Sequence, residues 1–140
     1  MRIVLDTNVA PSALLWRGTP WRLLQAIERN EALQLFTGAA LLAELADVMT
    51  RPVPAKRLAL FGRPAHELLT DYIEAVDLVT PFAIPAVVSA DPDDDQVIAA
   101  AVAAHAGLIV SGDRHPLDLG SHQEIRIVTP AEALRLVGIP

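Results

Sequence analysis

Acidic side chains gather in one short stretch of this 140-residue chain and recur at three distant positions. The stretch DPDDD, residues 91–95, places four acids in five positions, directly before the apolar run QVIAAAVAAHAGLIV. Asp6 follows the apolar RIVL, Asp113 follows LIVSG, and Glu44 lies among leucines at helical spacing. Because burying an unpaired carboxylate is costly, acids that converge from separate segments predict a cation site. Carboxylate oxygens and water suit hard ions such as Mg²⁺ and Mn²⁺.

Strands that alternate with helices are predicted to position these acids. We expect strands at 2–5, 33–37, 107–113 and 125–129, with a further short strand at 77–80. We expect helices from about residue 9 to 30 with a break at RGTP, then over 39–50 and 65–76, from the acidic stretch to about residue 106, and after Thr129. This alternation is typical of an α/β fold with a parallel sheet. The segment 51–64 holds three prolines and a glycine, so a loop with at most a short helical turn is predicted there.

The predicted sheet would bring the acids to one edge. Asp6 and Asp113 follow strands, and the carboxyl ends of parallel strands are where ligands bind in open α/β sheets. Asp95 lies near the start of the helix that leads into LIVSGD, and a right-handed crossover places that helix start at the same edge. Glu44 shares the apolar side of its helix with Leu41 and Leu45, so its carboxylate is expected to point inward.

Helix capping is an alternative explanation for part of the acidic stretch. Asp91 suits an N-cap, Pro92 the first helical position, and Asp93 the positive end of the helix dipole. Asp95 is explained less well, because it lies three residues before Ile98 on the apolar side. Asp94 has a similar position, so helical phase does not separate these two acids.

Other chemistries have less support in the sequence. A calcium loop would need glycine where Gln96 stands and glutamate where Val102 stands. Taken alone, Asp6 could serve a turn and Glu44 an exposed helix surface. Phosphate loops of the GxxxxGK type are absent, the four histidines lack zinc-ligand spacing, and the serines have no evident base partner.

Composition indicates one globular domain over residues 1–140, with 52% hydrophobic residues and no apolar run long enough to cross a membrane. The absence of cysteine fits a reducing, cytoplasmic setting. A net charge of −6 alone disfavours binding to nucleic acid. The distribution is uneven, however, because four of the eleven basic residues fall within positions 51–63.

Four motifs together resemble the PIN-domain family, and within it the VapC-like toxins of bacterial toxin–antitoxin pairs. They are VLDTNV, the inward Glu44 after the second strand, DDDQVIAAAVAAHAGLIVSGD, and IRIVTPAEAL. The resemblance covers residues 2–137 and implies a three-layer α/β/α fold with a central parallel sheet of four or five strands. It also favours Asp95 over Asp94, because the family has an acid directly before a similar xxIAA run.

Residue by residue, the resemblance implies an acidic quartet that binds metal and acts in catalysis: Asp6, Glu44, Asp95 and Asp113. Asn8 and Ser111 match small polar residues that orient these acids. One position departs from the family pattern, since His115 stands where a further acid is common. Either the quartet suffices, or a second metal ion is held weakly.

The implied activity is Mg²⁺- or Mn²⁺-dependent hydrolysis of single-stranded RNA, in which one ion activates water and a second stabilises the leaving oxygen. The implied partners are a cognate antitoxin and a second copy of the chain, with no membrane. A non-catalytic PIN-like module that binds protein or RNA is an alternative. A receiver-like phosphotransfer domain is another, but the only lysine, Lys56, lies in the proline-rich segment.

Overall fold

A parallel β-sheet forms the middle layer of the computed structural model, which describes residues 1–81, 92–112, 121–122 and 124–138. The sheet has the strand order β3-β2-β1-β4-β6-β5. Its strands are β1 (Arg2–Leu5), β2 (Gln34–Gly38), β3 (Asp77–Val79), β4 (Leu108–Val110), β5 (Ser121–His122) and β6 (Ile125–Val128). All neighbouring pairs are parallel except β5 and β6. The predicted sheet of four or five parallel strands is therefore confirmed, and the two-residue β5 was not predicted.

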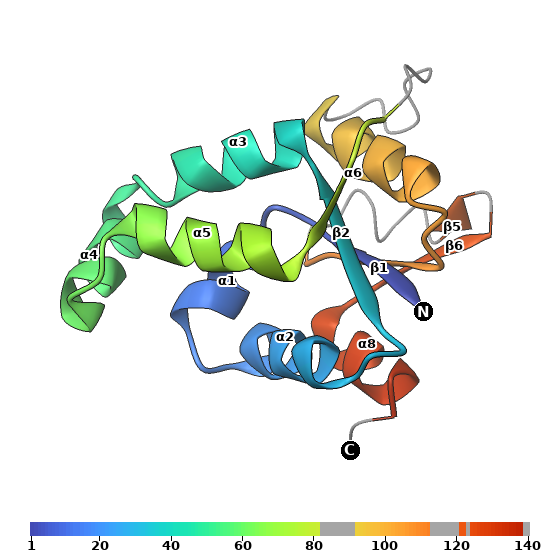
Figure 1. Cartoon of the computed structure of the whole chain (residues 1–140), viewed down its shortest axis with the longest axis horizontal. Helices are drawn as coiled ribbons and strands as arrows, with labels where there is room; N and C mark the ends of the chain where they lie inside the picture. The colour runs from blue at the N-terminus through green and yellow to red at the C-terminus, as the bar shows by residue number, and fades with distance from the viewer. Residues whose placement is uncertain (82–91, 113–120, 123, 139–140) are drawn as a thin grey trace.

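Helices cover both faces of the sheet (Figure 1). They are α1 (Ala10–Leu15), α2 (Thr19–Arg29), α3 (Ala39–Val48), α4 (Pro52–Phe61), α5 (Ala65–Ala75), α6 (Pro92–Ala103) and α8 (Pro130–Leu136). Successive side chains of β1, β2, β4 and β6 point to opposite faces of the sheet and pack into two separate hydrophobic cores. Ile3 and Leu5 of β1 pack with α1, α2, α5 and α8, whereas Val4 packs with α6. This arrangement confirms the three-layer α/β/α fold.

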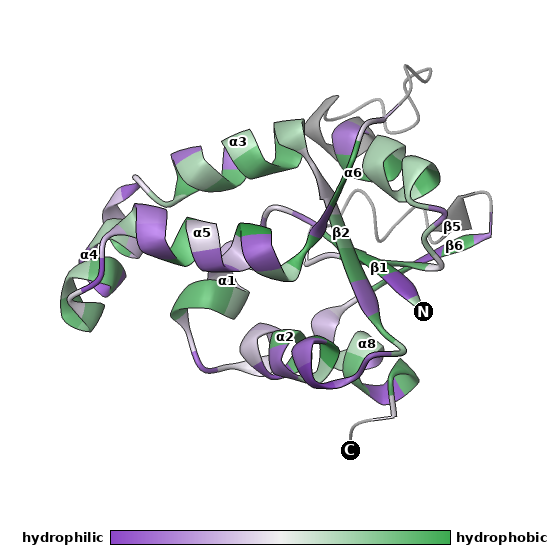
Figure 2. Ribbon diagram, viewed as in Figure 1, coloured by the Kyte–Doolittle hydropathy of each residue, from purple (hydrophilic) through white to green (hydrophobic). Residues whose placement is uncertain are grey.

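Small side chains let α6 lie close to the sheet. Ala100, Ala101 and Ala104 are fully buried, and the helix contacts β1, β2 and β4. Its ribbon is mostly hydrophobic in Figure 2, whereas polar and apolar bands alternate along α2. A Cβ atom built on Gly38 of β2 would lie 3.8 Å from the Cβ of Ala100. The small buried alanines therefore set the separation of α6 from the sheet.

The prediction of a loop over 51–64 is wrong, because α4 is a ten-residue helix. Its prolines, Pro52 and Pro54, fall in the first turn, where backbone N–H groups have no partner within the helix and proline is tolerated. The following residues AKRLALF are mostly good helix formers. The helix ends at Gly62, whose φ of 66° gives the left-handed conformation typical of a C-terminal cap.

The start of α8 agrees with the sequence. Thr129 is the N-cap, and its hydroxyl oxygen accepts a hydrogen bond from the Glu132 N–H at 3.2 Å. The Glu132 carboxylate accepts from the Thr129 hydroxyl at 3.1 Å, rather than from the backbone N–H that a capping box would use. Among the described residues, no helix has the length and apolar character needed to cross a bilayer.

Candidate functional site

The order of the strands reverses between β1 and β4, because β2 and β3 extend the sheet on one side and β6 on the other. Such a switch point leaves a crevice at the carboxyl ends of the two strands, where α/β proteins bind ligands. Asp6 comes directly after β1 and Ser111 directly after β4. The Asp6 N–H donates to the Val110 carbonyl at 2.9 Å, which fixes the two strand ends side by side.

Asp6 is a buried carboxylate held by donors from both strand ends. It is 3% exposed, and its Oδ2 accepts a hydrogen bond of 2.7 Å from the hydroxyl of Ser111, which is 0% exposed. Its Oδ1 accepts from the Thr7 N–H, also at 2.7 Å. The Asp6 carbonyl accepts from the N–H groups of Val9 and Ala10 at the start of α1. Main chain and side chain therefore fix the orientation of this acid.

Glu44 reaches the same place from α3. Leu41 and Leu45 on this helix are buried, and Glu44 is half-buried between them, as predicted from its helical phase. Its Oε1 accepts a hydrogen bond of 3.0 Å from the Thr7 hydroxyl. Asp6 and Glu44, 38 positions apart in the sequence, are thus both within hydrogen-bond distance of one residue.

Thr7 is a site residue that the sequence reasoning missed. It lies between two predicted site residues, Asp6 and Asn8, and its hydroxyl is a donor suited to a neighbouring carboxylate, so its position was the available signal. Asn8 itself is exposed, and its Oδ1 accepts from the Gly112 N–H at 3.3 Å. Asn8 therefore links the loop after β1 to the loop after β4.

The other two predicted acids are less completely described. Asp95 lies in the first turn of α6, but its side chain is not among the described ones. Asp113 and His115 lie outside the described residues. Within the described part of the chain, no three His, Cys, Asp or Glu side chains gather to hold a metal ion. The structure thus brings together Asp6, Glu44, Ser111 and Asn8 of the predicted site.

The donor set at the switch point fits a hard divalent cation. Two carboxylates, a hydroxyl and an amide supply only oxygen ligands, which Mg²⁺ and Mn²⁺ prefer. Each carboxylate oxygen has two lone pairs, so it can accept a protein hydrogen bond and coordinate a cation at once. Asp6 and Glu44 would hold the ion, with Ser111 and Thr7 orienting them.

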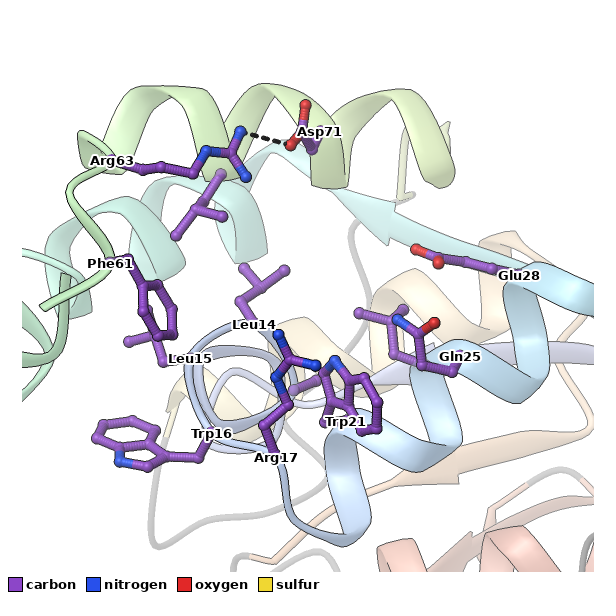
Figure 3. Close-up of a pocket in the computed structure, with 13 residues that line it drawn as sticks. Leu14, Leu15, Trp16, Arg17, Trp21, Gln25, Glu28, Phe61, Arg63 and Asp71 are labelled. Atoms are coloured by element: carbon purple, nitrogen blue, oxygen red, sulfur yellow. Dashed lines mark hydrogen bonds and ion pairs between the residues drawn. The ribbon is translucent and has the colours of Figure 1, made fainter.

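A pocket of about 440 Å³ lies elsewhere, between α1, α2, α4 and α5 (Figure 3). Trp16, Trp21 and Phe61 line it, and the Arg17 guanidinium lies 4.8 Å from the centre of the Trp21 ring. Arg63 also lines the pocket, and its hydrogen bond to Asp71 is the main cause of the raised pKa of its guanidinium. None of the carboxylates at the switch point contributes to its lining.

The basic segment between Arg51 and Arg63 is largely engaged with its own neighbours. Arg51 pairs with Asp47 at 3.2 Å, and Arg63 pairs with Glu67 and Asp71. Arg57 donates to the Leu15 carbonyl at 2.8 Å. The ion pairs are exposed, and such pairs contribute little to stability.

Replacing Ser111 by alanine should lower the free energy of unfolding by about 1.5–3 kcal/mol, the range for a hydrogen bond to a charged group. The hydroxyl is fully buried and serves the buried Asp6, so its loss removes a donor that water does not replace. Urea unfolding would measure the change. Ser12→Ala is the control, since this half-buried hydroxyl makes no hydrogen bond within the described residues. Equal effects of the two substitutions would contradict the prediction.

A sequence model of the PIN domain matches residues 2–115 of the chain. Among solved structures, the crystal structure of VapBC2 from Rickettsia felis bound to a DNA fragment from their promoter contains a similar chain, with a TM-score of 0.60. The likeness covers 91% of this chain and 97% of that one at 13% sequence identity, so it shows a shared fold. No curated protein has a significantly similar sequence.

Proposed function

This chain belongs to the PIN-domain family, and on that premise we propose that it is a metal-dependent ribonuclease that hydrolyses phosphodiester bonds of single-stranded RNA. The observation that carries the proposal is the meeting of Asp6 and Glu44 on Thr7 at the sheet's switch point. Two carboxylates brought this close repel each other, and a divalent cation offsets that repulsion. PIN domains are nucleases in general, so a phosphodiester is the expected substrate of a site that binds such a cation.

The chain's own residues would divide the work as follows. Asp6, the more buried acid, would be the central ligand, and Glu44 would bind the cation or accept a proton from water. We propose that Asp95 and Asp113 complete the ligand set. A bound Mg²⁺ or Mn²⁺ would supply a water of lowered pKa and neutralise charge on the phosphate. Ser111 would keep Asp6 in its orientation.

The partners follow from the family and from the fold. The similar chain from Rickettsia felis belongs to VapBC2, and we propose that this protein is likewise the toxin of a toxin–antitoxin pair. Its partners would be a small cognate antitoxin and a second copy of the chain. RNA as the substrate would place its action in the cytoplasm.

The purified protein should cleave single-stranded RNA when Mg²⁺ or Mn²⁺ is added, and EDTA should abolish the cleavage. Asp95→Asn should reduce the rate strongly, because it removes a charge from the proposed ligand set. Asp93→Asn is the matched control, since this acid lies on the same helix and should serve only its start. Gel assays on a labelled RNA would measure both rates.

Calorimetric titration with Mn²⁺ would separate this proposal from the non-catalytic alternative. A ribonuclease with this site should release or absorb heat on binding the ion, and EDTA should reverse the binding. A protein that binds RNA or another protein without catalysis would show no strong heat with Mn²⁺. Cleavage that persists in EDTA would contradict the proposal itself.

A further inference from the structure

Thr7 supplies a separate donor to each of the two described acids. Its N–H donates to Asp6 Oδ1 at 2.7 Å, and its hydroxyl donates to Glu44 Oε1 at 3.0 Å. The residue is 9% exposed, so water has little access to these hydrogen bonds. One residue thus contacts a carboxylate that follows β1 and a carboxylate from α3.

The Thr7 hydroxyl donates its hydrogen bond to Glu44 rather than to Asp6. A threonine hydroxyl carries a single proton, and its distance to Asp6 Oδ1 is 3.4 Å, at the long end for a hydrogen bond. The distance to Glu44 is shorter, and Asp6 Oδ1 already accepts from the Thr7 N–H. The backbone amide therefore serves Asp6, and the hydroxyl serves Glu44.

This division matters because the two acids differ in burial and in side-chain length. Asp6 is short, buried and held by Ser111 as well. Glu44 is longer and half-buried, and a glutamate gives up more conformational entropy when it is fixed in one rotamer. The hydrogen bond from the Thr7 hydroxyl to the charged Glu44 opposes the repulsion between Glu44 and Asp6, and its loss would favour rotamers of Glu44 that turn away from Asp6.

We propose that Thr7 is a positioning residue that holds Glu44 beside Asp6, so that a divalent cation meets a preformed pair of carboxylates. The proposal rests on the proposed function, because it concerns the affinity of the same site for its metal ion. On this proposal, Thr7 raises the affinity of the site for the cation without having to touch the ion. Groups that orient metal ligands in this way typically change affinity by about 10–100-fold.

Calorimetric titration of the full chain with Mn²⁺ tests the proposal. Thr7→Val has nearly the shape of threonine, keeps the N–H to Asp6 and removes only the hydroxyl. It should raise the Kd for Mn²⁺ by about 10–100-fold. Thr70→Val is the matched control, since the Thr70 hydroxyl donates to the His66 carbonyl on exposed α5 and should leave the Kd unchanged. Thr7→Val with an unchanged Kd would overturn the proposal.

A second pair of variants covers the case in which valine disturbs folding at this buried position. Thr7→Ser and Thr7→Ala both lack the methyl group and differ only in the hydroxyl. The Thr7→Ser variant should bind Mn²⁺ like the unchanged protein, and the Thr7→Ala variant should bind it at least about tenfold more weakly. Equal affinities of these two variants would refute the role of Thr7 while leaving the proposed ribonuclease standing. If the unchanged protein binds no Mn²⁺, both proposals fail.

Discussion

Replacing Asp6 by asparagine should lower the rate of RNA cleavage by at least about 100-fold, because a direct ligand should matter more than the 10–100-fold typical of groups behind it. The substitution removes the charge that would attract the cation at the more buried of the two described acids. Folding should survive, since the amide oxygen can still accept from the Thr7 N–H. The Ser111 hydroxyl can rotate and accept from the new amide nitrogen.

A surface aspartate provides the control for this substitution. Asp47→Asn changes an acid on α3 whose side chain is 70% exposed and pairs only with Arg51 among the described residues. It should leave the cleavage rate unchanged. Cleavage assays should be run beside urea unfolding of each variant, so that loss of activity is separated from loss of fold. Full activity in Asp6→Asn would remove the acid from the proposed mechanism.

Replacing Ile98 by alanine should lower the free energy of unfolding by about 2–5 kcal/mol. Ile98 is 0% exposed and packs on α6 against the core that contains Val4, Phe36 and Ile109. The residues that follow it on α6, Ala99, Ala100 and Ala101, are too small to fill the space that the deletion would leave. A total stability of about 5–15 kcal/mol is usual for a domain, so this loss is large.

An exposed isoleucine distinguishes burial from residue type. Ile73 on α5 is 50% exposed, and its replacement by alanine should change stability by less than about 0.5 kcal/mol. Urea unfolding at one temperature would measure both variants. If Ile98→Ala cost no more than Ile73→Ala, α6 would not pack on the sheet in solution as it does in this structure.

The strands and the described part of the site were readable from the sequence, because each carries a strong local signal. The last three residues of RIVL form a continuous apolar run, as buried parallel strands require, and IRIV is apolar except for the exposed Arg126. Asp6 directly follows such a run, so its place at the carboxyl edge followed from the fold class, whereas Ser111 was assigned to the site through the family resemblance. Glu44 was placed by its phase relative to Leu41 and Leu45. In each case two or three neighbouring residues were enough.

The features that were missed depend on position or on distant partners. Pro52 and Pro54 indicated a loop, but proline is harmless in the first turn of a helix, and the sequence did not mark where that turn begins. The two-residue β5 depends on pairing with β6, which no local pattern encodes. Thr7 is important because its hydroxyl faces Glu44, and that contact exists only after α3 has docked.

The alanine packing of α6 should make the proposed activity sensitive to substitutions in the core beneath this helix. Ala100 is fully buried, so a much larger side chain at this position would overpack the core and push the helix outward. The acids in the first turn of α6 would move together with the helix. A shift of about 1 Å in a catalytic group can lower the rate of a reaction by about 100-fold. Substitutions in this part of the core could thus abolish RNA cleavage even when all four proposed acids are unchanged.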